Sequence, residues 1–512
     1  MNDINPQTVA VQYKDSALSV MRSSTLAVAY QLIGDTLAAG DSQRALYITE
    51  QLLLQHGEYV PLLWMKAYIL EVQGIDWNHR LQFCEQALAI DPQHFEFCLM
   101  KGDLLRKLAR HHESIDWYQA CLAFYPDRWE LYTSLGITLN ETTETQRAEA
   151  VFRKALALNK YNAIAWFQLI GITEFSRQDL NQMQASLKKK NISPSDKAQI
   201  AFAIAAYWRK LANVESEAHY LKMANEIQAV GQNYNAAANK QIIQQTIEQF
   251  DRSTFEKISS LIEKTQSELS SKAIFIVGMP RSGSTMLEQM LAQQPDMTST
   301  GESCLLEICL SQTSNRKNLA SMRPSLIPAL SEQSIIEFRQ NYEQRISTAV
   351  TTPVYSDKSL DNYRIVGLIK AAFPESKIIS IERHPLDIIL SCYQNSFGDV
   401  AYSNKLSDLT KYYINYRKLM AHWQSVFEQP FLSVQYEQLV ADPETQAKQI
   451  CEYCELDWRP EMLDFHLNKA AVNTVSKQQV RSPIYATSVS RWKPYEKLLQ
   501  PVIRKLEAEG YL

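Results

Sequence analysis

The sequence predicts an N-terminal array of helical repeats (an α-solenoid) followed by an α/β domain with a parallel sheet, and three observations lead to this prediction. Glycine makes up only 14 of the 512 residues, well below the usual share of about 7%, which favours helices. The first half of the chain repeats itself at an interval of 34 residues. In the second half, short β-branched apolar runs alternate with helical patterns, as expected when helices cover both faces of a parallel sheet.

The composition is that of a folded protein, with 46% hydrophobic and 21% charged residues, which excludes a mainly disordered chain. A formal net charge of −4 gives no overall positive field, so we expect no nucleic-acid partner. Residues 1–13 lack the apolar core of a signal peptide, and no apolar run reaches the ~18 residues of a membrane span. Eight cysteines do not make a disulfide framework, so we expect a reducing, cytoplasmic location.

The repeat interval rests on ladders of equivalent residues. Pro92 and Pro126 are 34 residues apart, and Gly102 and Gly136 keep the same interval. Two further ladders continue the register, one of small residues and one of mostly aromatic residues: Ala87, Cys121 and Ala155, and Trp64, Cys98, Tyr132 and Trp166. Such ladders indicate a helix–turn–helix unit in which small residues let the helices approach and proline begins the next turn.

These segments resemble tetratricopeptide repeats, most clearly over residues 61–170. We interpret residues 17–58 as a divergent preceding unit and residues 195–250 as another repeat or cap. The resemblance implies that the array recruits a protein or peptide, although a scaffold that only stabilises the neighbouring domain is an alternative. The expected domains are a repeat array, a linker helix and an α/β domain, at 17–250, 251–271 and 272–512.

The α/β half begins with the apolar run at 273–277, which is typical of a buried strand. Similar runs at 377–381 and 430–434 predict further strands. Helical patterns at 360–373 and 385–397 flank the second of these strands. The alternation predicts a parallel sheet between helices.

A glycine-containing turn follows the first predicted strand. Gly278 and Gly283 bound it, and Ser284 and Thr285 open the next helix, which is a favourable place for an anion. Both glycines and Thr285 match the nucleoside-triphosphatase loop G-x-x-x-x-G-K-[ST], but Ser284 replaces the lysine and the cation is Arg281. Without that lysine the loop lacks the charge used in γ-phosphoryl transfer, so the pattern favours phosphate binding and counts against a kinase-like enzyme.

A second anion-binding element follows the strand at 377–381. Arg383 comes directly after this strand, and Pro385 begins the next helix, as proline often does. Arg383 offers a forked donor and Ser391 a hydroxyl, so the two residues can hold a second phosphate. A surface ion pair is the alternative for Arg383 considered alone.

Together, PRSGST at 280–285 and ERHPLDIILS at 382–391 resemble the two nucleotide-binding elements of sulfotransferases that use 3′-phosphoadenylyl sulfate (PAPS). The similarity covers about 272–512 and is greatest to the tyrosylprotein-sulfotransferase-like group. It implies a P-loop-like α/β sulfotransferase domain, PAPS as co-substrate and no metal. It also implies sulfuryl transfer to a hydroxyl, with protein or peptide tyrosine as the favoured acceptor.

The resemblance also assigns binding roles to individual residues. The 5′-phosphosulfate is expected to contact the first element, at Arg281, Ser282, Gly283, Ser284 and Thr285. Arg383 and Ser391 are expected to hold the 3′-phosphate, and Tyr436 to lie near the adenine. Arg481 and Lys493 are further expected nucleotide contacts.

Three residues are expected to act in catalysis. Glu302 stands 21 residues after Arg281, where the family has the general base that takes the proton of the acceptor. Lys358 is expected to stabilise the leaving oxygen, and Ser476 to assist the leaving phosphate. A carboxylate at a helix N-terminus and a solvated surface lysine are the alternatives for Glu302 and Lys358.

Other functions stay open at this stage. The acceptor can be a carbohydrate or a small-molecule hydroxyl, or the chain can be a non-enzymatic interaction protein built on its repeats. The spacing of Cys451 and Cys454 is that of a redox motif, but both lie in an apolar helical pattern, which favours core packing. The sequence names neither the acceptor nor the oligomeric state.

Overall fold

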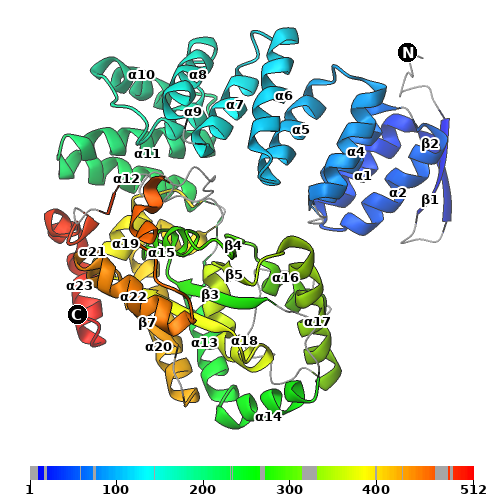
Figure 1. Cartoon of the computed structure of the whole chain (residues 1–512). Coiled ribbons are helices and arrows are strands. Elements are labelled where there is room, and N and C mark those ends of the chain that lie inside the picture. Colours follow the sequence, from blue (N-terminus) through cyan, green and yellow to red (C-terminus); the bar gives the residue numbers. More distant parts are fainter. Residues whose placement is uncertain are drawn as a thin grey trace. The chain divides into compact units, whose positions relative to one another are not determined.

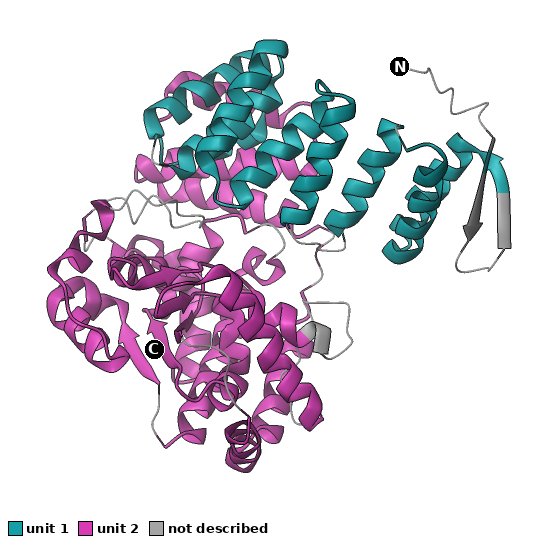
Figure 2. Cartoon of the chain, turned by 45° about the vertical axis from the view of Figure 1, so that its right-hand side comes forward, with its two compact units in different colours: residues 1–173 teal, residues 174–512 magenta. Residues whose placement is uncertain are grey.

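The computed structural model divides the chain into two compact units, residues 1–173 and 174–512 (Figures 1 and 2). Each unit is described by itself. The structure describes residues 10–15, 20–57, 59–72, 77–142, 144–230, 232, 234–265, 271–313, 331–397, 400–428, 431–467, 483–484 and 488–512.

The first unit consists of a β-hairpin followed by paired helices. Strands β1 (Ala10–Asp15) and β2 (Val20–Thr25) pair antiparallel, with Ala10 opposite Thr25. The helices are α1 (Leu26–Ala38), α2 (Ser42–Gln55), α3 (Val60–Val72), α4 (Trp77–Ile90), α5 (Phe95–Lys107), α6 (His111–Phe124), α7 (Trp129–Glu141), α8 (Thr145–Leu158) and α9 (Ala163–Gln168). The expected divergent unit at 17–58 is therefore helical only from Leu26, because the residues before it pair with β1.

The repeat ladders have a direct packing basis. A side chain at Gly102 would come within 2.3 Å of the Tyr118 ring, and one at Gly136 within 2.6 Å of Phe152. Each glycine thus lets an aromatic ring of the following helix lie against its own helix. Pro92 stands in the turn between α4 and α5. The interval of 34 residues reflects this helix-pair packing.

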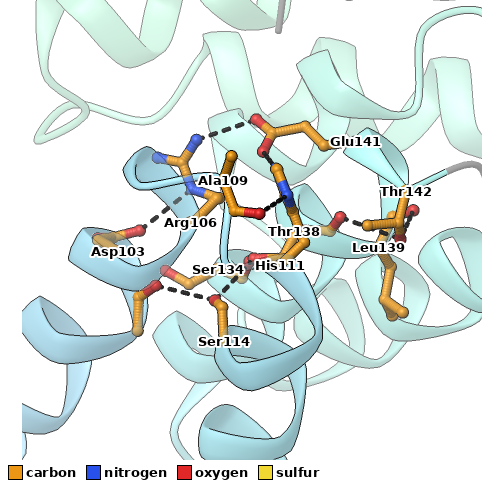
Figure 3. A network of polar contacts seen from close by, with 11 residues as sticks. Asp103, Arg106, Ala109, His111, Ser114, Ser134, Thr138, Leu139, Glu141 and Thr142 are labelled. Carbon is orange, nitrogen blue, oxygen red and sulfur yellow. Dashed lines mark hydrogen bonds and ion pairs between the residues drawn. The ribbon is translucent and has the colours of Figure 1, made fainter. Parts of the chain in front are cut away.

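Buried charges connect α5, α6 and α7 (Figure 3). Arg106 Nη1 donates to Glu141 Oε1 over 2.9 Å, and His111 Nε2 lies 3.4 Å from Glu141 Oε2. Ser114 Oγ donates to the carbonyl oxygen of Gly102 over 2.8 Å. The Glu141 side chain is only 4% exposed, so its charge is balanced inside the helical array.

The second unit begins with helices and continues into the sheet domain. Its α-helices are α10 (Arg177–Leu187), α11 (Pro194–Lys210), α12 (Val214–Gln228), α13 (Ala236–Gln249), α14 (Arg252–Glu263), α15 (Ser284–Leu291), α16 (Leu305–Thr313), α17 (Glu332–Ala349), α18 (Val366–Ala372), α19 (Pro385–Tyr393), α20 (Leu406–Val426), α21 (Tyr436–Ala441), α22 (Pro443–Cys454) and α23 (Glu496–Ala508). Its 3-10 helices are η3 (Leu360–Ile365), η4 (Ala401–Asn404), η5 (Pro460–Leu467) and η8 (Lys493–Tyr495).

Within the described residues, a parallel sheet of five strands forms the centre of this unit. Its spatial order is β4 (Met297–Ser299), β5 (Val354–Asp357), β3 (Lys272–Gly278), β6 (Lys377–Glu382) and β7 (Leu432–Gln435). The chain extends the sheet first on one side of β3 and then on the other. In open parallel sheets, ligands bind beyond the carboxyl ends of the strands at such a reversal.

Helices cover both faces of the sheet. On one face, Ile274 and Ile276 of β3 pack with Leu287 of α15 and Ile450 of α22. On the other face, Phe275 contacts the rings of Tyr342 and Phe373. Cys451 and Cys454 of α22 are buried in the first of these clusters. The predicted α/β fold is confirmed.

The division into compact units differs from the boundary expected at residue 250. Helices α10 to α13 belong to the same compact unit as the sheet. For α12, a hydrogen bond to α19 helps to explain this grouping. Asn225 Nδ2 donates to the carbonyl oxygen of Tyr393 over 3.0 Å. Among the described residues, no helix is long and apolar enough to cross a membrane.

Candidate active site

The carboxyl edge of the sheet gathers residues from every strand. Arg281 and Glu302 stand three residues after the ends of β3 and β4, and Lys358, Arg383 and Tyr436 directly follow β5, β6 and β7. Because the strands are parallel, these positions meet at one edge. Residues far apart in the sequence therefore come together here.

The loop between β3 and α15 is held in an unusual backbone conformation. Arg281 has φ 69° and Gly283 has φ 104°, a left-handed region that favours glycine. A side chain at Gly283 would lie 2.4 Å from the Tyr436 ring. The loop therefore packs closely on Tyr436 and turns the N-terminus of α15, at Ser284 and Thr285, toward the cavity. Such a terminus attracts anions.

Two arginines meet behind this loop. Arg281 Nε donates to Ser391 Oγ over 2.9 Å, and Arg383 Nη1 donates to the carbonyl oxygen of Arg281 over 3.0 Å. The Arg383 guanidinium lies 4.6 Å from the centre of the Tyr436 ring. The two elements predicted from the sequence thus form one buried, positively charged corner.

This corner retains unused hydrogen-bonding capacity. Ser282 Oγ and Arg383 Nε are buried and have no hydrogen-bond partner among the described residues. Buried polar atoms are normally paired, and a phosphate offers several strong acceptors. The residues present therefore fit an anionic group.

A lysine between two carboxylates lies opposite the loop. Lys358 Nζ is 2.5 Å from Glu302 Oε1 and 3.7 Å from Glu288 Oε2. The Lys358 side chain is fully buried, whereas that of Glu302 is 49% exposed. Burial raises the pKa of Glu288, and the Lys358 charge opposes this shift. Glu302 is therefore the more accessible carboxylate of this group.

Asp357 holds the backbone around this lysine. Its carboxylate accepts from Ser303 Oγ over 2.8 Å and from the Ser359 backbone N–H over 2.9 Å. The Lys358 backbone N–H donates to the carbonyl oxygen of Gly301 over 2.9 Å. Full burial raises the pKa of Asp357. These contacts fix the segments that carry Glu302 and Lys358 relative to each other.

A cavity of about 230 Å³ is lined by Glu302 and by the loop between β3 and α15. Arg281 and Thr285 are among the residues that this loop and the start of α15 contribute. The rest of the lining includes three aromatic and two acidic residues, together with small, apolar and amide side chains: Tyr363, Phe397, Tyr402, Glu307, Asp361, Cys304, Ser359, Leu360, Asn362 and Val400.

One described residue that was singled out from the sequence stands apart from this group. Lys493 is exposed on η8, and its charge lies near His384 rather than in the cavity lining. Ser476 and Arg481 lie outside the described residues.

Several residues near the site were not identified from the sequence. Glu288 lies in the buried helix α15, where a polar residue among apolar ones was the available signal. Asp387 in the apolar run of α19 is similar, and its carboxylate accepts from the backbone N–H groups of Ser490 and Trp492 over 2.8 and 3.0 Å. Ser488 contributes only its carbonyl oxygen, which accepts from Arg383 Nη2. No side-chain pattern reveals a contact of that kind.

Comparison with known proteins finds family matches in both units of the chain. The sulfotransferase family matches residues 273–460, which hold the β3 loop, Glu302, Lys358, Arg383 and Tyr436. The tetratricopeptide repeat matches residues 95–128, which span α5 and α6. The chain therefore contains a sulfotransferase-family domain and a tetratricopeptide repeat, as the sequence predicted.

Individual relatives are distant. An uncharacterized protein of Aquifex aeolicus (strain VF5) is 26% identical over 431 residues, covering 81% of this chain and 55% of that protein. Protein-tyrosine sulfotransferase A of Caenorhabditis elegans is 23% identical over 256 residues, covering 46% of this chain and 65% of that protein. A putative protein-tyrosine sulfotransferase of Caenorhabditis briggsae is 25% identical over 250 residues, 46% of this chain and 84% of that protein. The chain thus spans about half to two thirds of the first two relatives.

Solved structures also resemble parts of the chain. The sulfotransferase domain from the Synechococcus PCC 7002 olefin synthase is 20% identical, with a TM-score of 0.31, and the match covers 45% of this chain and 90% of that one. MamA from Desulfovibrio magneticus RS-1 is 16% identical, with a TM-score of 0.27, and the match covers 32% of this chain and 93% of that one.

Proposed function

We propose that this protein transfers the sulfuryl group of PAPS to a tyrosine hydroxyl of a protein or peptide. The observation that carries the proposal is the pairing of buried Lys358 with Glu302, which lines the same cavity as the loop between β3 and α15. The printed names of the two Caenorhabditis relatives agree with this acceptor.

The proposed donor site uses the buried, positively charged corner. The N-terminus of α15, with Ser284 and Thr285, receives the 5′-phosphosulfate together with Arg281 and Ser282. Arg383 and Ser391 receive the 3′-phosphate, and Tyr436 lies beside the adenine. The unpaired Ser282 Oγ and Arg383 Nε support this assignment, because a phosphate supplies the acceptors that these atoms lack.

Glu302 and Lys358 act together in the proposed reaction. The acceptor oxygen forms a bond to sulfur as the bond from sulfur to the bridging phosphate oxygen breaks, and the electron pair stays on that oxygen. Glu302 accepts the acceptor's proton. This protonation removes the charge that faces Lys358 Nζ at 2.5 Å, so the ammonium becomes available to stabilise the departing oxygen.

The lining of the cavity favours an aromatic acceptor. Tyr363, Phe397 and Tyr402 provide ring surfaces beyond Glu302, and aromatic rings pack favourably on one another. In this proposal a phenol packs on these rings and brings its hydroxyl to Glu302, which lines the same cavity. A carbohydrate hydroxyl gains less from such surfaces.

The repeat array completes the proposal as the part that recruits the acceptor protein, since such arrays offer extended surfaces for peptides. We also propose that the chain consists of three domains: a repeat array at 17–250, a linker helix at 251–271 and a transferase domain at 272–512. None of the eight cysteines, all of which lie in the described part of the chain, forms a disulfide, which supports the proposed cytoplasmic location.

Two measurements test the proposed function. Isothermal titration of the full-length protein compares 3′-phosphoadenosine 5′-phosphate with ATP and Mg²⁺, and we expect binding of the bisphosphate. PAPS labelled with ³⁵S is then offered with a tyrosine peptide and with its phenylalanine counterpart, and label should enter only the tyrosine peptide. Binding of ATP without binding of the bisphosphate would rule out the PAPS assignment. Label recovered only in carbohydrate would rule out tyrosine.

A further inference from the structure

Glu217 of α12 is a buried carboxylate away from the proposed chemistry. Its side chain is 0% exposed, and it does not line the cavity beside the β3 loop. It lies 56 residues before the segment that matches the sulfotransferase family. Burying a carboxylate is costly unless several donors compensate for the lost water, so its partners indicate what it does.

Three side chains donate to this carboxylate. Arg209 Nε and Gln394 Nε2 donate to Glu217 Oε1 over 2.7 and 2.9 Å. The Tyr495 hydroxyl donates to Glu217 Oε2 over 2.5 Å. The three donors come from α11, from the end of α19 and from η8. Glu217 therefore joins three segments that are far apart in the sequence.

The contact with Gln394 reaches the proposed donor site through α19. Gln394 is the C-terminal cap of this helix, and Ser391 lies three residues before it. Ser391 Oγ accepts from Arg281 Nε over 2.9 Å. Asn225, about two turns further along α12, donates to the carbonyl oxygen of Tyr393 over 3.0 Å. Helix α12 thus holds the end of α19 at two points.

The contact with Tyr495 reaches the same site through the C-terminal segment Ser488–Trp492. The carbonyl oxygen of Ser488 accepts from Arg383 Nη2, and Asp387 accepts from the Ser490 and Trp492 backbone N–H groups. Tyr495 follows this segment within η8. Glu217 therefore fixes the end of the segment that contacts Arg383.

We propose that Glu217 is a positioning residue for the 3′-phosphate site, acting on Ser391 through Gln394 and on Arg383 through Tyr495. This inference rests on the proposed function. It assigns α12 to the transferase machinery, although the helix lies outside the matched family segment. Charge-assisted hydrogen bonds are short and directional, so a single carboxylate that accepts three of them can set the distance between α19 and the C-terminal segment.

The test measures the contribution of the 3′-phosphate rather than overall activity. Full-length Glu217→Gln is titrated with 3′-phosphoadenosine 5′-phosphate and with adenosine 5′-phosphate, which lacks the 3′ group. Glutamine presents an NH₂ group where one oxygen accepted, so it cannot serve all three donors. We expect the bisphosphate to bind about tenfold more weakly and the monophosphate to change less than twofold. The KM for PAPS should rise while kcat is kept.

Two further variants complete the experiment. Tyr495→Phe removes a single hydroxyl and should reduce the preference for the bisphosphate about threefold, and it decides the question if Glu217→Gln does not fold. Glu226→Gln is the matched control, because Glu226 lies on the same helix with its side chain 66% exposed. This control should leave both affinities unchanged.

The possible results separate the two proposals. A wild-type protein that binds both nucleotides equally overturns the 3′-phosphate site and with it the proposed function. A wild-type protein that prefers the bisphosphate, together with variants that keep the same preference, overturns the role of Glu217 alone. Equal weakening of both nucleotides in the variants also overturns the role of Glu217, since it indicates general destabilisation.

Discussion

Buried charges occur in both units of this protein, and their surroundings differ. In the repeat array, Glu141 faces Arg106 and His111 and is 4% exposed. At the sheet edge, Lys358 is fully buried between Glu288 and Glu302, and the Glu302 side chain is 49% exposed. The first group is closed on itself, whereas the second opens onto a cavity.

The difference separates two uses of a buried ion pair. A closed group keeps its charges matched and holds helices in register, with little net gain over apolar packing. An open group places one member where a ligand can reach it, so its charges can respond to a reaction. The predictions that follow test whether the two groups behave in these different ways.

Glu302→Gln should have the largest effect. Glutamine keeps the shape of the side chain but cannot take a proton, so kcat should fall by about 10²–10⁴. The affinity for 3′-phosphoadenosine 5′-phosphate should stay within about threefold of wild type. Glu302 is not part of the buried, positively charged corner that is proposed to hold the nucleotide. Single-turnover kinetics and titration check this pair of results. Full activity in the variant would remove Glu302 as the base.

Lys358→Met should come next. Methionine fills the buried space without the ammonium, and loss of one stabilising group for a developing oxyanion typically lowers kcat about 10²–10³-fold. Glu288 then remains buried without its cation, which should raise its pKa further. Steady-state rates at saturating PAPS and acceptor measure the loss. An unchanged kcat would show that the open group does not take part in transfer.

Glu141→Gln tests the closed group. Removing this charge leaves Arg106 with only the Asp103 carboxylate, 3.6 Å away and 42% exposed, which should cost about 1–3 kcal/mol of stability. Hydrogen exchange should increase in α5, α6 and α7, while kcat per correctly folded molecule stays the same. A fall in kcat without loss of stability would contradict the view that the Glu141 group has only a structural role. Glu149→Gln, on the more exposed face of α8, is a suitable control.

The smallest effect concerns Glu307 in the cavity lining. Burial, and then the Asp361 charge, raise its pKa to about 7. A carboxylate with a raised pKa in the folded state favours folding while it is protonated. The chain should therefore lose stability as pH rises from about 4.5, the ordinary value, through about 7.

Glu307→Gln should remove this pH dependence. The expected gain at pH 8 is about 1 kcal/mol, reduced from the full linkage value because the half-buried group is partly screened by solvent. Melting temperatures of wild type and variant at pH 5 and pH 8 measure it. Parallel curves for the two proteins would show that Glu307 is not the titrating group.

The sequence predicted the parts of the fold that have a strong local signal. The 34-residue interval followed from Gly102 and Gly136, whose close helix contacts demand small residues. Strands β3 and β6 were recognised because they are buried apolar runs. Strands β4 and β5 were not, because each is short and half polar. The hairpin β1–β2 pairs residues before the first repeat, which the repeat interval cannot reveal.

Contacts made by single polar side chains were the least predictable. The pattern of α12 gives a helix, but it does not indicate that Glu217 and Asn225 face α19. These contacts contribute to placing α12 in the same compact unit as the sheet. In the site, the glycine-containing loop and the segment that carries Arg383 were recognised from their residues and spacing, whereas the only signal for Glu288 was its place among apolar residues of α15.

Each strand of the sheet supplies a residue to the candidate site at its carboxyl end. This arrangement determines which parts of the chain can vary without disturbing the site. The β3 loop, Lys358, Arg383 and Tyr436 are fixed by strand register, so they depend little on the length or content of the segments between strands. The stretch from α16 to α17, between β4 and β5, can therefore differ in length or composition while these strand-end residues keep their places at one edge of the sheet.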